Sequence, residues 1–150
     1  METRLNYYQA SPKTVDGLSA FSDLLQSSFS DHKLKVLVEL RVSQINGCAF
    51  CVDLHSHQAR EQGEKQQRLD TLSVWREVTF FTEREQAALD WAEAVTLVSE
   101  SRVPDDVYER AKKAFSEAEL VQLTGIIAAM NAWNRFSISF RKPVAQRTGA

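Results

Sequence analysis

QINGCAFCVDLHSHQ, residues 44–58, holds both cysteines of the chain and two of its three histidines. Asn46 and Gly47 tolerate a positive φ, which is typical of the point where a helix ends. The segment after them contains no proline and reaches Gly63 before the next glycine. We therefore expect one helix to end at this stretch and a second to run over about residues 48–62, with the cysteines at its start.

The sequence before this stretch also has a helical pattern. Apolar residues recur every three or four positions over residues 15–29 and again over residues 31–46. Ser30 is the expected N-cap of the second of these helices, and Asp31 would complement its dipole. The valines within residues 36–42 leave a β-strand open as an alternative there.

The sequence after the stretch carries further helix-start signals and few helix breakers, with five glycines and three prolines in 150 residues. The expected segments are a short helix within 65–74, a helix from the Thr82–Glu85 capping box to about 99, a helix with Pro104 in its first turn, and a helix from the Ser116–Glu119 capping box to about 136. This gives six or seven helices in all. The predicted fold class is all-α, in a single domain over residues 1–150.

Composition excludes several classes of function. The net charge is −2, and no run of lysine and arginine suggests a nucleic-acid partner. No apolar stretch approaches the roughly 20 residues that span a bilayer, and no signal peptide is recognisable, so we expect a cytoplasmic protein without a membrane partner. In that reducing compartment, a cysteine pair is more often metal-binding or catalytic than a static disulfide.

Helical geometry places three reactive side chains on one face. At about 100° per residue, Cys48, Cys51 and His55 fall within an arc of about 60°. The free N–H groups and partial positive charge of a helix N-terminus stabilise a thiolate. His55 lies one turn beyond Cys51, where it can accept a proton from the thiol. The set supplies a nucleophile, a base and a resolving thiol, which indicates redox chemistry.

Two other readings of these residues stay open. A zinc site with two cysteines and His55 would lack the fourth ligand of a structural centre, because His57 points to another face of the helix. The cysteines would otherwise be buried and unreactive. We expect His57 and His32 to be surface residues.

Three longer segments are together more specific than a Cys-x-x-Cys motif. They are LRVSQINGCAFCVDLHSHQAREQGE (40–64), LDTLSVWREVTFFTEREQAALDWAEAVT (69–96) and NAWNRFSISFR (131–141). They resemble the alkylhydroperoxidase D-like branch of the carboxymuconolactone decarboxylase family. The resemblance covers about residues 15–142, the expected core of the domain.

The resemblance implies an all-α homo-oligomer, a trimer or a hexamer, with peroxidase activity. Cys51 would attack the hydroperoxide, Cys48 would then resolve the sulfenic acid as a disulfide, and His55 would take part in proton transfer. No bound cofactor is implied. An external dithiol, such as a lipoyl group, would reduce the disulfide. The decarboxylase branch lacks the cysteine pair, which argues against lactone decarboxylation here.

One position departs from the family pattern. The family has a proton-relay glutamate twelve residues before the first cysteine, and Val36 occupies that position in this chain. Glu39, one helical turn later, would either replace it or be an ordinary solvated carboxylate. The departure leaves a non-enzymatic redox sensor or scaffold oligomer as the main alternative, followed by a zinc hydrolase built on Cys48, Cys51 and His55.

Overall fold

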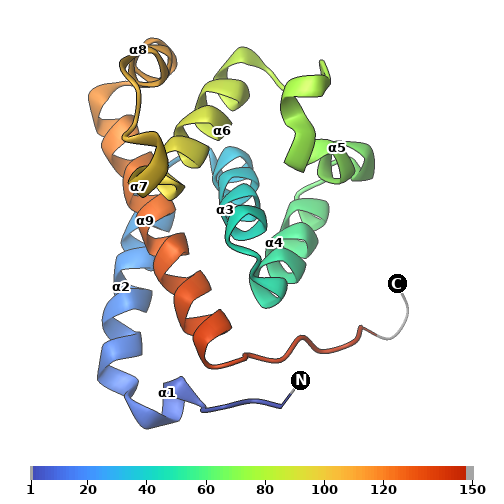
Figure 1. Cartoon of the computed structure of the whole chain (residues 1–150), viewed down its shortest axis with the longest axis vertical. Coiled ribbons are helices and arrows are strands. Elements are labelled where there is room, and N and C mark those ends of the chain that lie inside the picture. Colours follow the sequence, from blue (N-terminus) through green and yellow to red (C-terminus); the bar gives the residue numbers. More distant parts are fainter. Residues whose placement is uncertain (1, 148–150) are drawn as a thin grey trace.

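The computed structural model describes residues 2–147, which form nine α-helices, one 3₁₀ helix and no β-strand (Figure 1). In chain order the elements are α1 (Tyr7–Ala10), α2 (Pro12–Ser28), α3 (His32–Asn46), α4 (Ala49–Glu61), α5 (Gln66–Thr71), the 3₁₀ helix η1 (Leu72–Glu77), α6 (Glu83–Thr96), α7 (Val98–Ser101), α8 (Asp105–Ala114) and α9 (Glu117–Ser139). The all-α prediction is confirmed. The predicted number of helices is too low, because α1 and α7 are single turns too short to show an apolar period.

Two helix starts follow the predicted capping chemistry. At α6, the Thr82 side chain accepts from the Glu85 N–H, and the Glu85 carboxylate accepts from the Thr82 N–H. Ser116 and Glu119 form the same reciprocal pair at α9. Each box provides partners for two backbone N–H groups, which explains why both helices begin where the sequence predicts.

Other helix starts differ from the prediction. Asp31, not Ser30, is the N-cap of α3, and its carboxylate accepts from the Leu34 N–H. Helix α2 begins at Pro12, earlier than the apolar pattern indicates, because proline is well suited to the first helical position. Pro104 is itself the N-cap of α8 and does not lie in its first turn.

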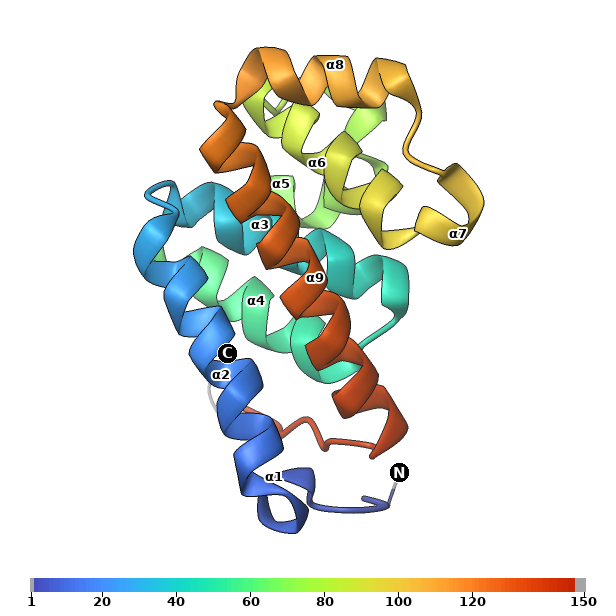
Figure 2. The ribbon, with the colours of Figure 1, turned by 90° about the vertical axis from the view of Figure 1, so that its left-hand side faces the viewer.

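Helix α3 lies at the centre of the molecule, with α4, α6 and α9 packed around it (Figure 2). Its Val38 and Val42 join the core formed with α2, α6, α8 and α9, while Val36 and Leu40 join a second core formed with α4, α5 and η1. The strand alternative for residues 36–42 is therefore wrong. Burial on several sides accounts for the dense apolar sequence that suggested it.

A carboxylate on α6 ties three elements together. Glu93 accepts hydrogen bonds from Arg41 Nε on α3 at 2.8 Å and from Trp75 Nε1 on η1 at 2.9 Å, and it also pairs with Arg76. Burial raises the pKa of Glu93, but these donors outweigh burial, and the net pKa is lowered. Among residues 2–147, no helix has the length and apolar content needed to span a bilayer.

Replacement of Glu93 by alanine is expected to lower the free energy of unfolding by about 2 kcal/mol, because three donors lose their shared acceptor. Urea denaturation followed by circular dichroism measures the change. Glu109→Ala is the matched control, since Glu109 is exposed and lies 3.9 Å from its partner Lys112. Equal midpoints for the two variants would show that the Glu93 cluster adds no stability.

Candidate functional site

The turn between α3 and α4 places the two cysteines. Gly47 has a φ of 70°, in the left-handed region that favours glycine, and it ends α3 as predicted. Cys48 is the N-cap of α4, and its sulfur accepts from the Cys51 N–H at 3.3 Å. Cys48 and Cys51 form a disulfide, with Cα atoms 5.3 Å apart. An N–H group at the start of α4 therefore contacts the sulfur of Cys48 directly, whereas Cys51 lies about one turn further along the helix.

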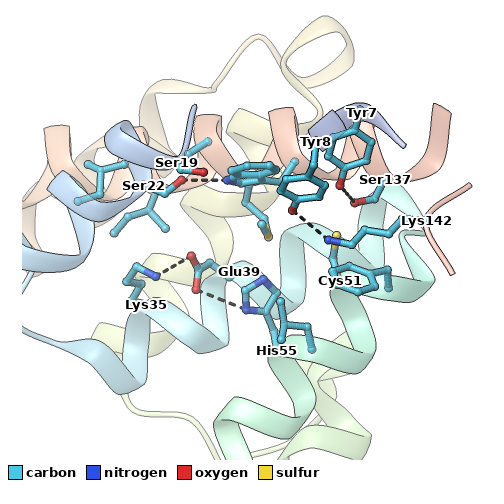
Figure 3. Close-up of a pocket in the computed structure, with 17 residues that line it drawn as sticks. Tyr7, Tyr8, Ser19, Ser22, Lys35, Glu39, Cys51, His55, Ser137 and Lys142 are labelled. Carbon is cyan, nitrogen blue, oxygen red and sulfur yellow. Dashed lines mark hydrogen bonds and ion pairs between the residues drawn. The ribbon is translucent and has the colours of Figure 1, made fainter. Parts of the chain in front are cut away.

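A cavity of about 290 Å³ lies beside Cys51 (Figure 3). Cys51 is one of its lining residues and Cys48 is not, although both side chains are almost fully buried. Walls come from α1, α2, α3, α4, α9 and the segment that follows α9. The lining aromatic residues are Tyr7, Tyr8, Phe50 and Trp133, and the lining charged or titratable residues, apart from Cys51 and the tyrosines, are Lys35, Glu39, His55 and Lys142.

Glu39 faces this cavity from α3. Its Oε1 pairs with Lys35 Nζ at 2.7 Å, and its Oε2 lies 3.6 Å from His55 Nδ1 on α4 (Figure 3). Glu39 is 9% exposed, so it is not an ordinary solvated carboxylate. Val36 packs in the second core and does not line the cavity. On this helix, position 39 brings a carboxylate to His55.

The hydrogen bonds of His55 fix which nitrogen carries the proton. Nδ1 lies 2.9 Å from Gln58 Oε1, so Nδ1–H donates to this acceptor, and Glu39 Oε2 lies 3.6 Å from Nδ1 as an electrostatic contact. Nε2 is buried without a hydrogen-bond partner. Burial lowers the pKa of His55, and Lys35 acts in the same direction, while Glu39 and Gln58 oppose it. The neutral ring therefore presents an unshared electron pair on Nε2, as a general base requires.

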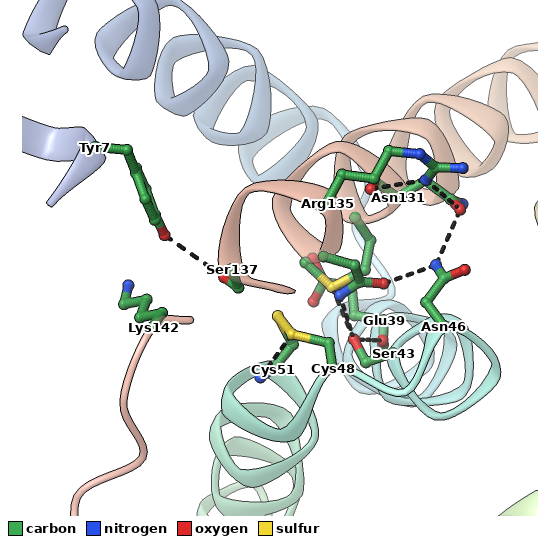
Figure 4. Close-up of a disulfide and its surroundings, with 12 residues drawn as sticks. Tyr7, Glu39, Ser43, Asn46, Cys48, Cys51, Asn131, Arg135, Ser137 and Lys142 are labelled. Carbon is green, nitrogen blue, oxygen red and sulfur yellow. Dashed lines mark hydrogen bonds between the residues drawn. A yellow bond between two sulfur atoms is a disulfide. The ribbon is translucent and has the colours of Figure 1, made fainter. Parts of the chain in front are cut away.

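A buried polar network lies next to Cys48 (Figure 4). Asn46 Nδ2 donates to Asn131 Oδ1 at 3.0 Å and to Asn134 Oδ1 at 2.9 Å. Asn134, which is fully buried, donates to Ser43 Oγ at 3.1 Å. These bonds fix the end of α3, and hence the cysteine turn, against α9. The paired asparagines in an otherwise apolar helix were the sequence signal for this network.

A comparison with family models shows which family the chain belongs to. The model of the carboxymuconolactone decarboxylase family matches residues 12–94, a segment that contains both cysteines, His55 and Glu39. The chain belongs to this family. The uncharacterized protein YdfG of Bacillus subtilis is 37% identical over 147 residues, which cover 98% of this chain and all of YdfG.

Solved structures of similar proteins extend the comparison. A crystal structure from Agrobacterium tumefaciens, of a protein of unknown function proposed to be the antioxidant-defence protein AhpD, has 42% identity and a TM-score of 0.95. It covers 97% of this chain, and this chain covers all of it. An uncharacterized peroxidase-related protein from Silicibacter shares the fold at 20% identity and a TM-score of 0.81, with 95% of this chain and 76% of that chain covered. The fold of the present chain is thus AhpD-like.

The structure brings most of the residues predicted from the sequence to one site in this family member. Cys51, His55 and Glu39 line the cavity, and Cys48 lies behind Cys51. His57 is partly exposed, with 41% of its side-chain surface accessible, and lies 3.3 Å from Glu61, as expected of a surface residue. Among residues 2–147, no three His, Cys, Asp or Glu side chains are placed to hold a metal ion.

The cavity also has lining residues that the sequence did not predict. Tyr7 and Tyr8 lie on the single turn α1, Lys142 follows α9, and Trp133 on α9 also lines the cavity. These residues come from opposite ends of the sequence, so no local pattern joins them. The one local sequence signal for this wall was the adjacent pair of aromatic residues, Tyr7 and Tyr8. In the structure their rings stack with centroids 4.6 Å apart.

Proposed function

We propose that this protein is a thiol-dependent peroxidase that reduces organic hydroperoxides through a Cys48–Cys51 dithiol/disulfide cycle. The observation that carries the proposal is the shared cavity, which Cys51, His55 and Glu39 all line, with Nε2 of His55 left without a hydrogen-bond partner. A redox cysteine beside an oriented base and an enclosed binding space is the arrangement that peroxide reduction needs.

In the oxidative half of the cycle, His55 Nε2 accepts the proton of the Cys51 thiol. The thiolate attacks the distal oxygen of the hydroperoxide, the O–O bond breaks, and the proton passes to the departing alkoxide, which leaves as an alcohol. Cys51 becomes a sulfenic acid. Cys48 then attacks that sulfur, so that water leaves and the disulfide forms. Glu39 is close enough to His55 Nδ1 to stabilise the protonated ring between these steps.

In the reductive half, an external dithiol such as a lipoyl group attacks Cys51, the cysteine that lines the cavity. The S–S bond breaks and Cys48 leaves as a thiolate. Its sulfur already accepts from the Cys51 N–H at the start of α4, where a negative charge is stabilised. The second thiol of the reductant then displaces Cys51 and closes its own disulfide. No bound cofactor takes part.

The proposal includes a homo-oligomer, a trimer or hexamer, that works in the reducing cytoplasm. Large apolar side chains such as Leu24 on α2 and Val121 on α9 are 61% and 73% exposed in the single chain. Contact between copies would remove such side chains from water.

The direct test is the consumption of cumene hydroperoxide with dihydrolipoamide as reductant. Many turnovers per protein chain are expected for the wild type, and none above background for a variant with serine at both cysteines. A redox sensor or scaffold, the second candidate suggested by Val36, would instead consume about one equivalent of peroxide and stop. Such a burst without steady turnover would contradict the peroxidase proposal.

A further inference from the structure

One cation in the cavity has no part in the proposed peroxidase cycle. Lys142 follows α9, and its ammonium donates to the Tyr8 hydroxyl at 3.0 Å. It lies 3.8 Å from the ring centroid of Phe50 and 4.7 Å from that of Tyr8. Within residues 2–147, no carboxylate pairs with it. Aromatic faces and one hydroxyl hold the ammonium in place and leave its charge unneutralised.

The other charges that line the cavity cancel. Lys35 and Glu39 form a close ion pair at 2.7 Å, and both side chains are nearly buried. His55 is neutral in the tautomer described above. The cavity of about 290 Å³ therefore carries a single net positive charge, which comes from Lys142.

The rest of the cavity favours a compact apolar ligand. The remaining apolar lining residues are aliphatic or aromatic: Leu25, Leu54, Ile126, Ala129, Met130 and Trp133. The volume lies near the lower end of the roughly 300–1,000 Å³ typical of ligand sites. Two polar atoms at its floor, His55 Nε2 and Glu39 Oε2, are buried without a hydrogen-bond partner, which is a sign that a ligand completes them (Figure 3).

We propose that the substrate is an aryl or short-chain alkyl hydroperoxide that carries one carboxylate, and that Lys142 binds this carboxylate. The peroxide group would lie at Cys51 and His55, and the apolar body would contact the walls from α2 and α9. This inference rests on the proposed function for the reacting group. The preference for a carboxylate, however, does not depend on turnover, and binding measurements test it separately.

Calorimetry with two unreactive analogues tests the preference. 4-Isopropylbenzoate and 4-isopropylbenzamide have nearly the same shape and differ in charge. We expect the wild type to bind the carboxylate about tenfold more tightly than the amide. In Lys142→Met the ratio is expected to fall to about one, and in Lys142→Arg it is expected to persist. Lys13→Met, at an exposed position in α2, is the matched control and should keep the wild-type ratio.

The two proposals fail in different ways. The role of Lys142 would be overturned if the wild type bound both analogues equally or bound both weakly. It would also be overturned if the preference for the carboxylate survived in Lys142→Met. A carboxylate preference that depends on Lys142, in a protein that turns over neither cumene hydroperoxide nor its 4-carboxylate derivative, would support the anion site and contradict the peroxidase. Circular dichroism of each variant confirms that it is folded, and Lys142→Arg keeps the charge if methionine disturbs the aromatic cluster.

Discussion

Replacement of Cys51 by serine is expected to reduce peroxide turnover by roughly 10³-fold or more, because a serine hydroxyl is not ionised near neutral pH and does not form a sulfenic acid. Cys51 lines the cavity and Cys48 does not, so the proposed cycle has the hydroperoxide react at the sulfur of Cys51. Steady-state consumption of cumene hydroperoxide with dihydrolipoamide measures the loss.

Cys48→Ser is the matched comparison, since it removes the other sulfur and keeps a good N-cap at the start of α4. This variant is expected to react once with peroxide and to stop as the Cys51 sulfenic acid, which dimedone labels and mass spectrometry detects. Two results together would show that Cys48, and not Cys51, attacks the peroxide. Dimedone would label Cys48 in the Cys51→Ser variant, and it would not label Cys51 in the Cys48→Ser variant.

Glu39→Gln is expected to lower kcat/KM for hydroperoxide by about 10²-fold, the usual size of a lost proton-transfer contribution. The substitution keeps the shape of the side chain but removes the charge that faces His55 Nδ1 at 3.6 Å. Glu61→Gln is the matched control, because Glu61 faces His57 at 3.3 Å in an exposed pair. No loss is expected there.

The pH profile separates a relay role for Glu39 from a structural one. Burial lowers the pKa of His55, and the charge of Glu39 partly restores it. Without that charge the pKa falls further, and His55 stays neutral in more acidic solution. The acidic limb of kcat/KM against pH should therefore move to lower pH in Glu39→Gln. An unmoved limb in a folded variant would count against the relay.

Helices were predictable from the sequence wherever local chemistry decides their ends. The capping boxes at Thr82 and Ser116 and the left-handed Gly47 set a helix end through contacts with residues a few positions away. Such short-range signals can be recognised in the sequence. The core-facing valines of α3 were ambiguous, since only packing on several sides makes a helix of them. The single turns α1 and α7 depend on their neighbours and were missed.

The residues of the candidate site likewise fall into those that local sequence predicts and those that only tertiary packing brings together. Cys48, Cys51 and His55 belong to one helix start, and helix geometry alone groups them. Glu39 was undecided, because its role depends on how α3 packs against α4. Lys142 was not predictable at all. It reaches Tyr8 across 134 positions of sequence, and only the folded chain brings the two together.

The double role of Cys48 has a consequence for the reduction potential of the disulfide. Its sulfur is a redox atom in the proposed cycle and is also the N-cap of α4. A disulfide sulfur is a weak hydrogen-bond acceptor, whereas a thiolate carries a full negative charge toward the free N–H groups of the first turn. The cap therefore stabilises the reduced form more than the oxidised form. Each 1.4 kcal/mol of such preference raises the potential by about 30 mV, so the start of α4 makes the disulfide easier for a dithiol to reduce.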